Sequence, residues 1–582
     1  MDALPLLEDL FKRYGSKGHA SWIQQQCEAT AKSCAVPEKI LELSELGNID
    51  VRTGARKNVE RDLVLWSRNQ PWRAVLPEAY EFKVWCRRRN REGVTCMPIK
   101  TILPHELLGA IYNFNVAVFM HLFIPSDAEL IEFWRHDGQR ELCAMHANNM
   151  DGAPLEKCIP IAVWGDDATF NKRDKWLALH WCSPLKTGLT RFDSRWLFGA
   201  LHYKRIIKTL TADCMYEAFV WSLQCAANGF YPSHDHTGRA FSATYHPERY
   251  QKSGEPIAGD YRFLFSETRG DMPWQIQTFH WVGFSHAVQC CHLCRASKSI
   301  HRLSYTDTRR QARHRQTLYT HAQYMMWTRE DTRSPLCRVP GWHLWRCWAD
   351  AQHCLDLGIL QHSNGSCLFV LASTTRFWSQ RTRQQRLEAA HRHYVEWCAA
   401  NNIADVGEMF TEATLRPKAT AYPMNKGFKA AEQRWMVHWL HAVLFSIAAP
   451  THEDQLMKLT YASLAQFDLV CRRNGRIVPP AELHVLQGAG DAFLASYNAL
   501  ALLALRRGQR LWKLVPKHHM FMHMIWDMSP VANPRTVHNY LDEAMIGHLK
   551  HIGAACHPSA ISHRVVDRYM LWTCVRLYQL RV

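Results

Sequence analysis

The sequence predicts a mixed α/β (α+β) protein, in which a sheet-forming core is combined with long helical regions. Strand-like segments gather between about residues 157 and 274, and helical periodicity dominates before and after them. The hydrophobic content of 47% over 582 residues is that of a folded chain with large cores. Disorder is therefore not expected.

Residues 1–150 are predicted to be a mainly helical N-terminal region. The longest apolar stretch, residues 107–124, carries Asn113, Asn115 and His121, so we expect a buried helix rather than a membrane span. No signal peptide opens the chain, and its 20 cysteines lack the spacing of a disulfide framework. These features predict a reducing compartment and no membrane partner.

Residues 151–375 are predicted to form the first part of the core. Residues 157–168 are a continuous apolar run that ends in acids, as in a central buried strand. Two further strands, a helix and a fourth strand ending near Asp271 follow, at 175–185, 195–203, 211–230 and 261–274. Three strands, a helix and a strand are the order in which an RNase H-like fold begins.

Residues 376–510 read as a large helical insertion, and residues 511–582 as the C-terminal part of the RNase H-like core. A last helix that carries Glu543 is predicted in this part. Asn533 suits its cap, Pro534 its first position and Gly553 its end.

Three acids are candidate ligands of divalent metal. Asp166 ends the first apolar strand, where a side chain can reach a cleft, and Asp167 competes with it. Asp271 and Glu543 follow where an RNase H-like nuclease needs its later acids, because two-metal phosphodiester chemistry requires several carboxylates. Helical phasing places Glu543 opposite the apolar stripe of its helix, which is equally typical of a solvated residue.

A zinc site is a second candidate. Cys291 and Cys294 are separated by two residues, a standard half-site, and His519 and His523 are one helical turn apart. The two pairs are about 225 residues apart. They form one site only in a fold that brings them together, and otherwise are two unrelated clusters.

A third group is Asp350, His353 and Asp356, spaced to share a helix face. It is either a metal-ligand set of its own or a buried polar network that orients the core.

The charge pattern favours a polyanionic partner. Lysine and arginine number 70 against 53 acids, a formal net charge of +17. Basic stretches at 308–315 and 376–386 are candidates to follow a phosphate backbone, and Phe377 and Trp378 to stack on bases. A solvated charged face is the alternative for both stretches.

Taken in order, these motifs resemble those of DDE transposases of the CACTA and Plavaka type. GDDATF resembles the strand of the first acid, GDMPW that of the second, and CHLC follows about 20 residues later. ADAQH resembles the Asp-x-x-His element, PKHHMFMHM the segment before the last acid, and YLDEAMIGHLK the glutamate helix. The V(D)J recombinase and its Transib relatives have a similar layout. The resemblance covers about residues 155–582, and Asp167 stands where the family usually has glycine.

The resemblance implies a DNA transposase that cleaves phosphodiesters and transfers strands with Mg²⁺ or Mn²⁺. Asp166, Asp271 and Glu543 would be the metal ligands of the DDE triad. A structural zinc ion would be held by a further set of ligands, Cys291, Cys294, His519 and His523, with His518 as a substitute for His519. It also implies transposon ends and target DNA as partners, a homo-oligomer and a nuclear location.

Two alternatives remain from the sequence. One is a domesticated, catalytically silent descendant of a transposase that only binds DNA. The other is a metal-dependent hydrolase centred on Asp350, His353 and Asp356.

Overall fold

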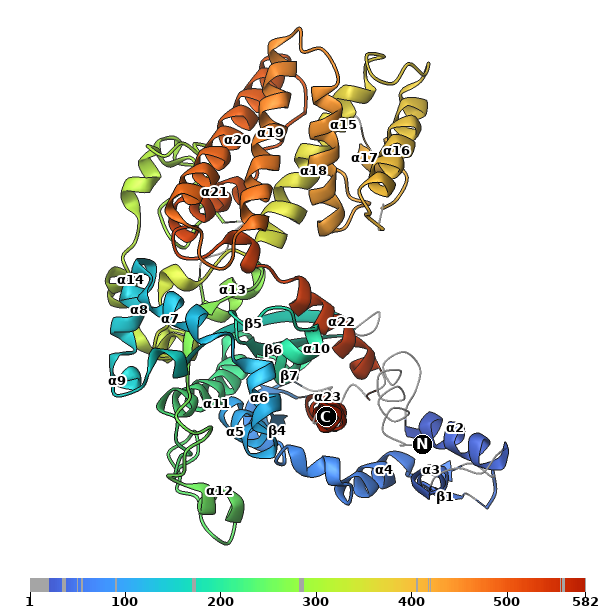
Figure 1. Cartoon of the computed structure of the whole chain (residues 1–582), viewed down its shortest axis with the longest axis vertical. Coiled ribbons are helices and arrows are strands. Elements are labelled where there is room, and N and C mark those ends of the chain that lie inside the picture. The colour runs from blue at the N-terminus through green and yellow to red at the C-terminus, as the bar shows by residue number, and fades with distance from the viewer. Residues whose placement is uncertain are drawn as a thin grey trace.

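The computed structural model describes most of the chain, namely residues 20–33, 38–49, 51–53, 56–88, 92–169, 174–281, 287–404, 407–416, 418, 420–554, 556 and 560–580. These residues form a sheet with helices packed on it and, at the other end of the molecule, a lobe of long helices (Figure 1). The predicted mixed α/β class is confirmed. Residues 1–19 of the predicted N-terminal region lie outside the described residues.

The central sheet has six strands in the order β3-β4-β7-β6-β5-β8. They are β3 (Tyr80–Arg87), β4 (Val94–Thr101), β5 (Cys158–Thr169), β6 (Lys175–Cys182), β7 (Trp196–His202) and β8 (Arg262–Thr268). β5 and β8 pair in parallel, and the other neighbours pair antiparallel. The strands predicted from the sequence are β5, β6, β7 and β8. β6 and β7 are almost entirely buried, which explains their continuous apolar sequence.

Two strands of this sheet come from the region predicted to be mainly helical. β3 alternates strictly between buried and exposed residues, and β4 pairs with it along its whole length. The sequence YEFKVWCR has the period of two that such a strand requires. The N-terminal region therefore adds a hairpin to the core as well as helices.

The N-terminal helices are short. They are α2 (Ala20–Ser33), α3 (Glu38–Ser44), α4 (Val59–Arg68), α5 (Pro104–Phe114), α6 (Val116–Phe123), α7 (Asp127–Arg135), α8 (Arg140–Met145) and α9 (Ala147–Met150), with a small ribbon of β1 (Asn48–Ile49) and β2 (Arg56–Lys57). The stretch 107–124, predicted as one buried helix, is divided between α5 and α6. Asn115 is extended there, and its side chain accepts hydrogen bonds from the N–H groups of Ala117 and Val118.

The core is completed by helices from three parts of the chain. α10 (Arg191–Ser194), α11 (Lys208–Asn228), α12 (Pro247–Lys252), α13 (Met272–Phe279) and α14 (His321–Trp327) follow the strands, and α22 (Tyr540–Ala554) and α23 (Ile561–Gln579) close the chain. α11 packs on β3 and β8, α22 on β5, and α23 on β4 and β7.

The helix of Glu543 begins later than predicted. Residues Pro534–Thr536 form a 3-10 turn, and α22 starts at Tyr540. The Asn533 side chain accepts a hydrogen bond from the Arg535 N–H and donates to the carbonyls of Cys471, Asn474 and Gly475. It therefore fastens this segment to the helical lobe instead of capping the helix.

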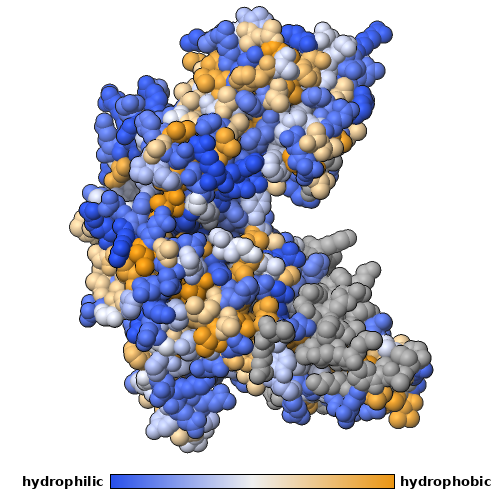
Figure 2. Space-filling model, viewed as in Figure 1, coloured by the Kyte–Doolittle hydropathy of each residue, from blue (hydrophilic) through white to orange (hydrophobic). Residues whose placement is uncertain are grey.

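The helical lobe is larger than the predicted insertion of residues 376–510. It contains α15 (Gln361–Ala372), α16 (Arg383–Ala400), α17 (Glu412–Leu415), α18 (Ala430–Phe445), α19 (His452–Arg473), α20 (Pro480–Arg506) and α21 (Pro516–His523), with π-helices at Gln352–Leu360 and Met524–Met528. α20 is long and apolar enough to cross a membrane by length and composition alone, and here it pairs with α19. Figure 2 shows this face of the molecule hollowed between the lobe and the core.

Candidate metal centre and acidic cluster

A tight hairpin presents the two cysteines. The Lys298 N–H donates to the Val288 carbonyl at 2.9 Å, and the Cys290 N–H donates to the Ala296 carbonyl at 3.1 Å. At the tip, the Leu293 N–H points at the Cys291 sulfur, 3.2 Å away. This short loop therefore directs Cys291 and Cys294 toward the same point.

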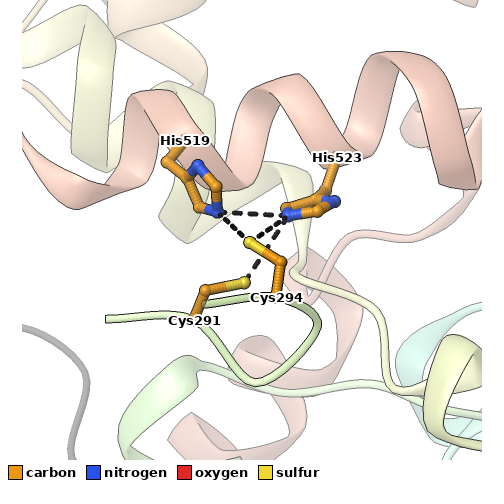
Figure 3. A group of neighbouring side chains, drawn as sticks. All are labelled: Cys291, Cys294, His519 and His523. Atoms are coloured by element: carbon orange, nitrogen blue, oxygen red, sulfur yellow. Dashed lines mark hydrogen bonds between the residues drawn. The ribbon is translucent and has the colours of Figure 1, made fainter. Parts of the chain in front are cut away.

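The two histidines come from α21. His519 and His523 are one turn apart on this helix, and both face the cysteine hairpin (Figure 3). The Cys294 sulfur lies 3.3 Å from His519 Nε2 and 3.7 Å from His523 Nε2. The Cys291 sulfur lies 3.5 Å from His523 Nε2, and the two Nε2 atoms are 3.1 Å apart. The fold thus brings together the two pairs that the sequence left separate.

These four side chains fit a zinc ion. Ligand atoms placed tetrahedrally at zinc's usual bond lengths are separated by about 3.3 to 3.8 Å, and the four separations given above, from 3.1 to 3.7 Å, are close to this range. All four residues are buried, and their ligand atoms lie within 4.8 Å of one another. Within the described part of the chain, no other group of three or more such residues meets this criterion. The site could hold a zinc ion.

A second layer of contacts orients the site. His523 Nδ1 lies 2.7 Å from Asp527 Oδ2, and Arg315 forms a bidentate ion pair with the same carboxylate. Burial opposes protonation of His523, but Asp527 and Cys294 outweigh it and raise its pKa to about 9. A carboxylate on the outer nitrogen is the usual support of a zinc-bound histidine. The sequence carries a signal for it, since Asp527 follows His523 by four residues.

His518, the alternative ligand, has a different environment. Its Nδ1 lies 3.1 Å from the Val515 carbonyl, and its ring contacts Tyr497. The cysteine sulfurs are approached by His519 instead.

Asp166 and Asp271 lie just beyond paired positions of two adjacent parallel strands. Val163 of β5 is paired with Thr268 of β8, and each acid follows its strand partner by three residues. Asp271 is the N-cap of α13, and its side chain accepts the Trp274 N–H at 2.8 Å. The parallel register therefore brings the two acids to one edge of this strand pair, although Asp166 lies inside β5, paired with Ala178 of β6, and not at the strand end predicted for it.

Two glycines allow this approach. A Cβ at Gly165 or at Gly270 would collide with the Trp274 ring, and Gly270 also has a φ of +138°. Trp274 can therefore pack against β5 at Gly165 and against the turn that follows β8 at Gly270. This packing holds the start of α13, and with it Asp271, against the strand of Asp166.

His353 links the third acid to this edge. It lies on the π-helix Gln352–Leu360, with Nδ1 3.1 Å from both carboxylate oxygens of Asp350 and Nε2 3.0 Å from Glu543 Oε1. The segment before Asp350 runs alongside the end of β8, where the Trp348 N–H donates a hydrogen bond to the Thr268 carbonyl. This contact places Asp350 at the same edge of the sheet. Burial opposes the charge on His353, but Asp350 and then Glu543 raise its pKa to about 11.

The acids interact electrostatically. Burial, followed by the charge of Asp271, raises the pKa of Asp166 to about 7, and His353 acts against this rise. Burial also raises the pKa of Asp271, with Asp350 adding to the effect. We refer to Asp166, Asp271, Asp350, His353 and Glu543 as the acidic cluster. Among the described residues, their ligand atoms do not form a set as tight as the cysteine and histidine group.

Asp167 lies next to the acidic cluster and is not one of its members. Its N–H donates to Asp166 Oδ1 at 2.7 Å. Burial raises the pKa of Asp167 to about 6, and its main opposing charge is Lys175 rather than His353. Successive side chains of a strand point to opposite faces, so only one of the two can point at His353.

Asp356 belongs to a buried polar network. Its Oδ2 accepts a hydrogen bond of 2.5 Å from the Tyr540 hydroxyl, and Arg434 lies close enough to favour its charge. It does not share a ligand set with Asp350 and His353. Tyr540 begins α22, so Asp356 joins the π-helix to the helix of Glu543.

No sequence pattern predicts two buried groups of ion pairs beside the cluster. Arg195 pairs with Asp542 at 2.6 Å, and both side chains are at least 93% buried. Glu267 is shared between Arg269 and Arg476.

Each basic stretch has an arginine engaged in an ion pair within the protein, and others that are exposed. Arg315 pairs with Asp527, and Arg376 forms a bidentate ion pair with Asp454. The exposed arginines are Arg309, Arg310, Arg313 and Arg381. Trp378 is buried and stacks on Trp439, so it is a core residue and not a surface for bases.

Comparison with models of protein families and with curated proteins finds no match to this chain.

Proposed function

We propose that this protein is a metal-dependent nuclease of the DDE transposase type, which cleaves and rejoins DNA phosphodiesters. The observation that carries the proposal is the placement of Asp166 and Asp271 after paired positions of adjacent parallel strands, with Glu543 directed to the same edge by His353. The strand order β7-β6-β5-β8, with α11 between β7 and β8, supports an RNase H-like core.

Magnesium or manganese fits the chemistry of the donors. The candidate ligands are Asp166, Asp271 and Glu543, and carboxylate oxygens are what these cations prefer. Burial and mutual repulsion raise the pKa of both aspartates, a cost that a divalent cation would relieve. When bound, such ions activate the attacking oxygen and stabilise the leaving oxygen of a phosphodiester.

The remaining residues position these acids. His353 holds Glu543 through Nε2 and is itself held by Asp350 through Nδ1. Tyr540 ties the start of α22 to Asp356. These contacts fix the position and orientation of α22, the helix of Glu543, relative to the sheet.

A second candidate is a DNA-binding protein without cleavage activity. It is favoured by the ion pair of His353 with Glu543, which neutralises a candidate metal ligand within the chain itself. DNA as partner, self-association and a nuclear location stay predictions under both candidates.

Cleavage of labelled terminal-repeat DNA with Mg²⁺ or Mn²⁺ tests the proposal. Wild-type protein should cleave, and Glu543→Gln should reduce cleavage to background while keeping the fold. Glu396→Gln, at an exposed position of α16, is the matched control and should cleave normally. Salt-sensitive binding without cleavage by wild-type protein would favour the second candidate. Activity that requires Asp350 but not Glu543 would contradict the triad.

A further inference from the structure

A basic cavity separate from the acidic cluster lies between the core and the helical lobe. Its volume is about 590 Å³. It is bounded by the loop after β6, the ends of β8 and α19, and the segment that leads into α22. Asp166, Asp271 and Glu543 do not line it, but Arg269 and Leu541 do, each two residues before an acid of the cluster.

Positive charge dominates the lining. Seven lysines and arginines line the cavity against two glutamates, Glu129 and Glu132, both at exposed positions of α7. The cations are Lys186, Arg195, Arg269, Arg472, Arg473, Arg476 and Arg535. Arg472, Arg473 and Arg476 are close together in the sequence, whereas the other four come from distant parts of it, so only the fold brings all seven together.

Some of this charge is neutralised within the protein, and some is not. Arg195 is paired with Asp542, and Arg473 with Glu482. Arg269 and Arg476 share the single carboxylate of Glu267, which leaves an excess of positive charge. Arg535 has only a distant contact to Asp468, at 3.6 Å.

Four residues that line the cavity carry a polar side-chain atom that lacks a hydrogen-bond partner. Arg269 is only 3% exposed, yet its Nη2 has no acceptor, and the buried Ser183 Oγ has no partner. Arg476 Nε and Arg535 Nη1 also lack a hydrogen-bond partner. Buried donors of this kind are costly unless a ligand supplies an acceptor. Four of them around one cavity indicate an anion rich in acceptor oxygens.

A histidine in the same lining is held neutral, chiefly by its burial and then by the neighbouring arginines. Burial, followed by the charges of Arg269 and Arg195, lowers the pKa of His538 to about 3. His538 lines the same cavity. It therefore stays neutral and adds no positive charge of its own, while the arginines remain charged.

We propose that this cavity binds a phosphate group through Arg269, Arg476, Arg535 and Ser183. Guanidinium groups match the geometry of phosphate oxygens, and a hydroxyl adds a further donor. The side chains of Arg472 and Arg535 are each more than a third exposed, so the positive charge continues from the cavity to the surface. A row of this kind suits successive phosphates of a nucleic-acid strand, a source that rests on the proposed function. A free phosphate compound is the other source of the same chemistry.

Binding of a fluorescent single-stranded oligodeoxynucleotide to the full chain, without magnesium, tests the polymeric source. Arg535→Gln and Ser183→Ala should each weaken binding about tenfold, as for loss of one bond to a charged group. Arg535→Gln should also make the slope of log affinity against log salt concentration less steep, by about 0.7, the value for one phosphate contact on a single strand. Arg329→Gln removes one charge from an exposed arginine outside the cavity and should leave the affinity within about twofold.

Inorganic phosphate tests the other source by its effect on the melting temperature. Suppose that phosphate raises the melting temperature of wild-type protein but not that of Ser183→Ala and Arg535→Gln, while these variants bind the oligonucleotide normally. That result assigns the cavity to a free phosphate compound. If neither oligonucleotide nor phosphate distinguishes these variants from wild type, the proposal is wrong. Because the assay needs no cleavage, an inactive acidic cluster leaves its outcome unchanged.

Discussion

The cysteine and histidine group and the acidic cluster differ in how far the protein alone assembles them. In the first, four buried ligand atoms already lie within 4.8 Å of one another, close enough for one zinc ion. In the second, the carboxylates share one edge of the sheet, but His353 stands between Asp350 and Glu543. In the first group opposite charges face one another, since Asp527 and Cys294 raise the pKa of His523, whereas carboxylates repel one another. A structural site can therefore be preformed, while a catalytic one remains open.

Loss of a zinc ligand should have the largest effect on stability. Structural zinc contributes about 10 to 16 kcal/mol in small zinc domains, comparable to the whole stability of a typical domain. Cys294→Ser should therefore purify without zinc and lose the cooperative thermal transition of the wild-type chain. Cys290→Ser, at a buried neighbour outside the ligand group, is the control and should keep its zinc. Equal melting of the Cys294 variant and wild type would show that this centre is not structural.

Removing the support of His523 should have a smaller effect. Asp527→Asn keeps the shape of the side chain but removes the carboxylate that orients the imidazole. We expect zinc affinity to fall about 10- to 100-fold, as for other outer-shell partners. Competition with a chromophoric chelator measures it. Asp491→Asn, which alters a nearby acid bonded to Trp526, should leave zinc affinity unchanged; an equal loss there would point to general loosening of the lobe.

Asp356 should make stability depend on pH. Burial raises its pKa to about 7 in the folded chain, against 3.8 as the ordinary value. The folded state then holds a proton that the unfolded state has lost, so stability falls as pH rises from about 4 to 7. Asp356→Asn should remove this loss, on the order of 4 kcal/mol at pH 8, and have little effect at pH 4. Urea denaturation at both pH values measures it, and equal effects at the two would contradict the assignment.

Substitutions of the acids should have the smallest effect on stability. Asp166→Asn leaves the sheet pairing in place, and at pH 4, below its folded pKa of about 7, Asp166 is as neutral as the asparagine that replaces it, so we expect a change within about 1 kcal/mol in either direction. Urea denaturation at pH 4 without divalent metal is the measurement. A loss of several kcal/mol would mean that Asp166 is a structural residue, and the contrast with Cys294 would disappear.

The sequence predicted the parts of the fold that its local patterns encode. The apolar runs at β5, β6, β7 and β8 were found because strands buried on both sides have continuous apolar sequence. The hairpin of β3 and β4 was missed among helices, although β3 alternates with a period of two. The start of α22 was misplaced because the Asn533 side chain bonds to the lobe, a tertiary contact that no capping pattern reveals.

The candidate sites were predictable to different degrees. The spacing of Cys291 with Cys294, and of His519 with His523, identified two half-sites, but only the fold shows that they meet. Helical phasing predicts a solvated Glu543. In the structure, its orientation depends on an ion pair with His353, which lies on another helix. The basic cavity could not be found from the sequence, because only the fold brings the arginines at 472–476 beside Lys186, Arg195, Arg269 and Arg535.

Anomalous diffraction from crystals grown with zinc and soaked in Mn²⁺ tests the central claim most directly, because it locates both metals in one molecule. We predict a zinc peak among Cys291, Cys294, His519 and His523, and a manganese peak among Asp166, Asp271 and Glu543, with His353 displaced from Glu543. Zinc at its site with no manganese at the acids, under conditions in which the protein cleaves DNA, would contradict the account.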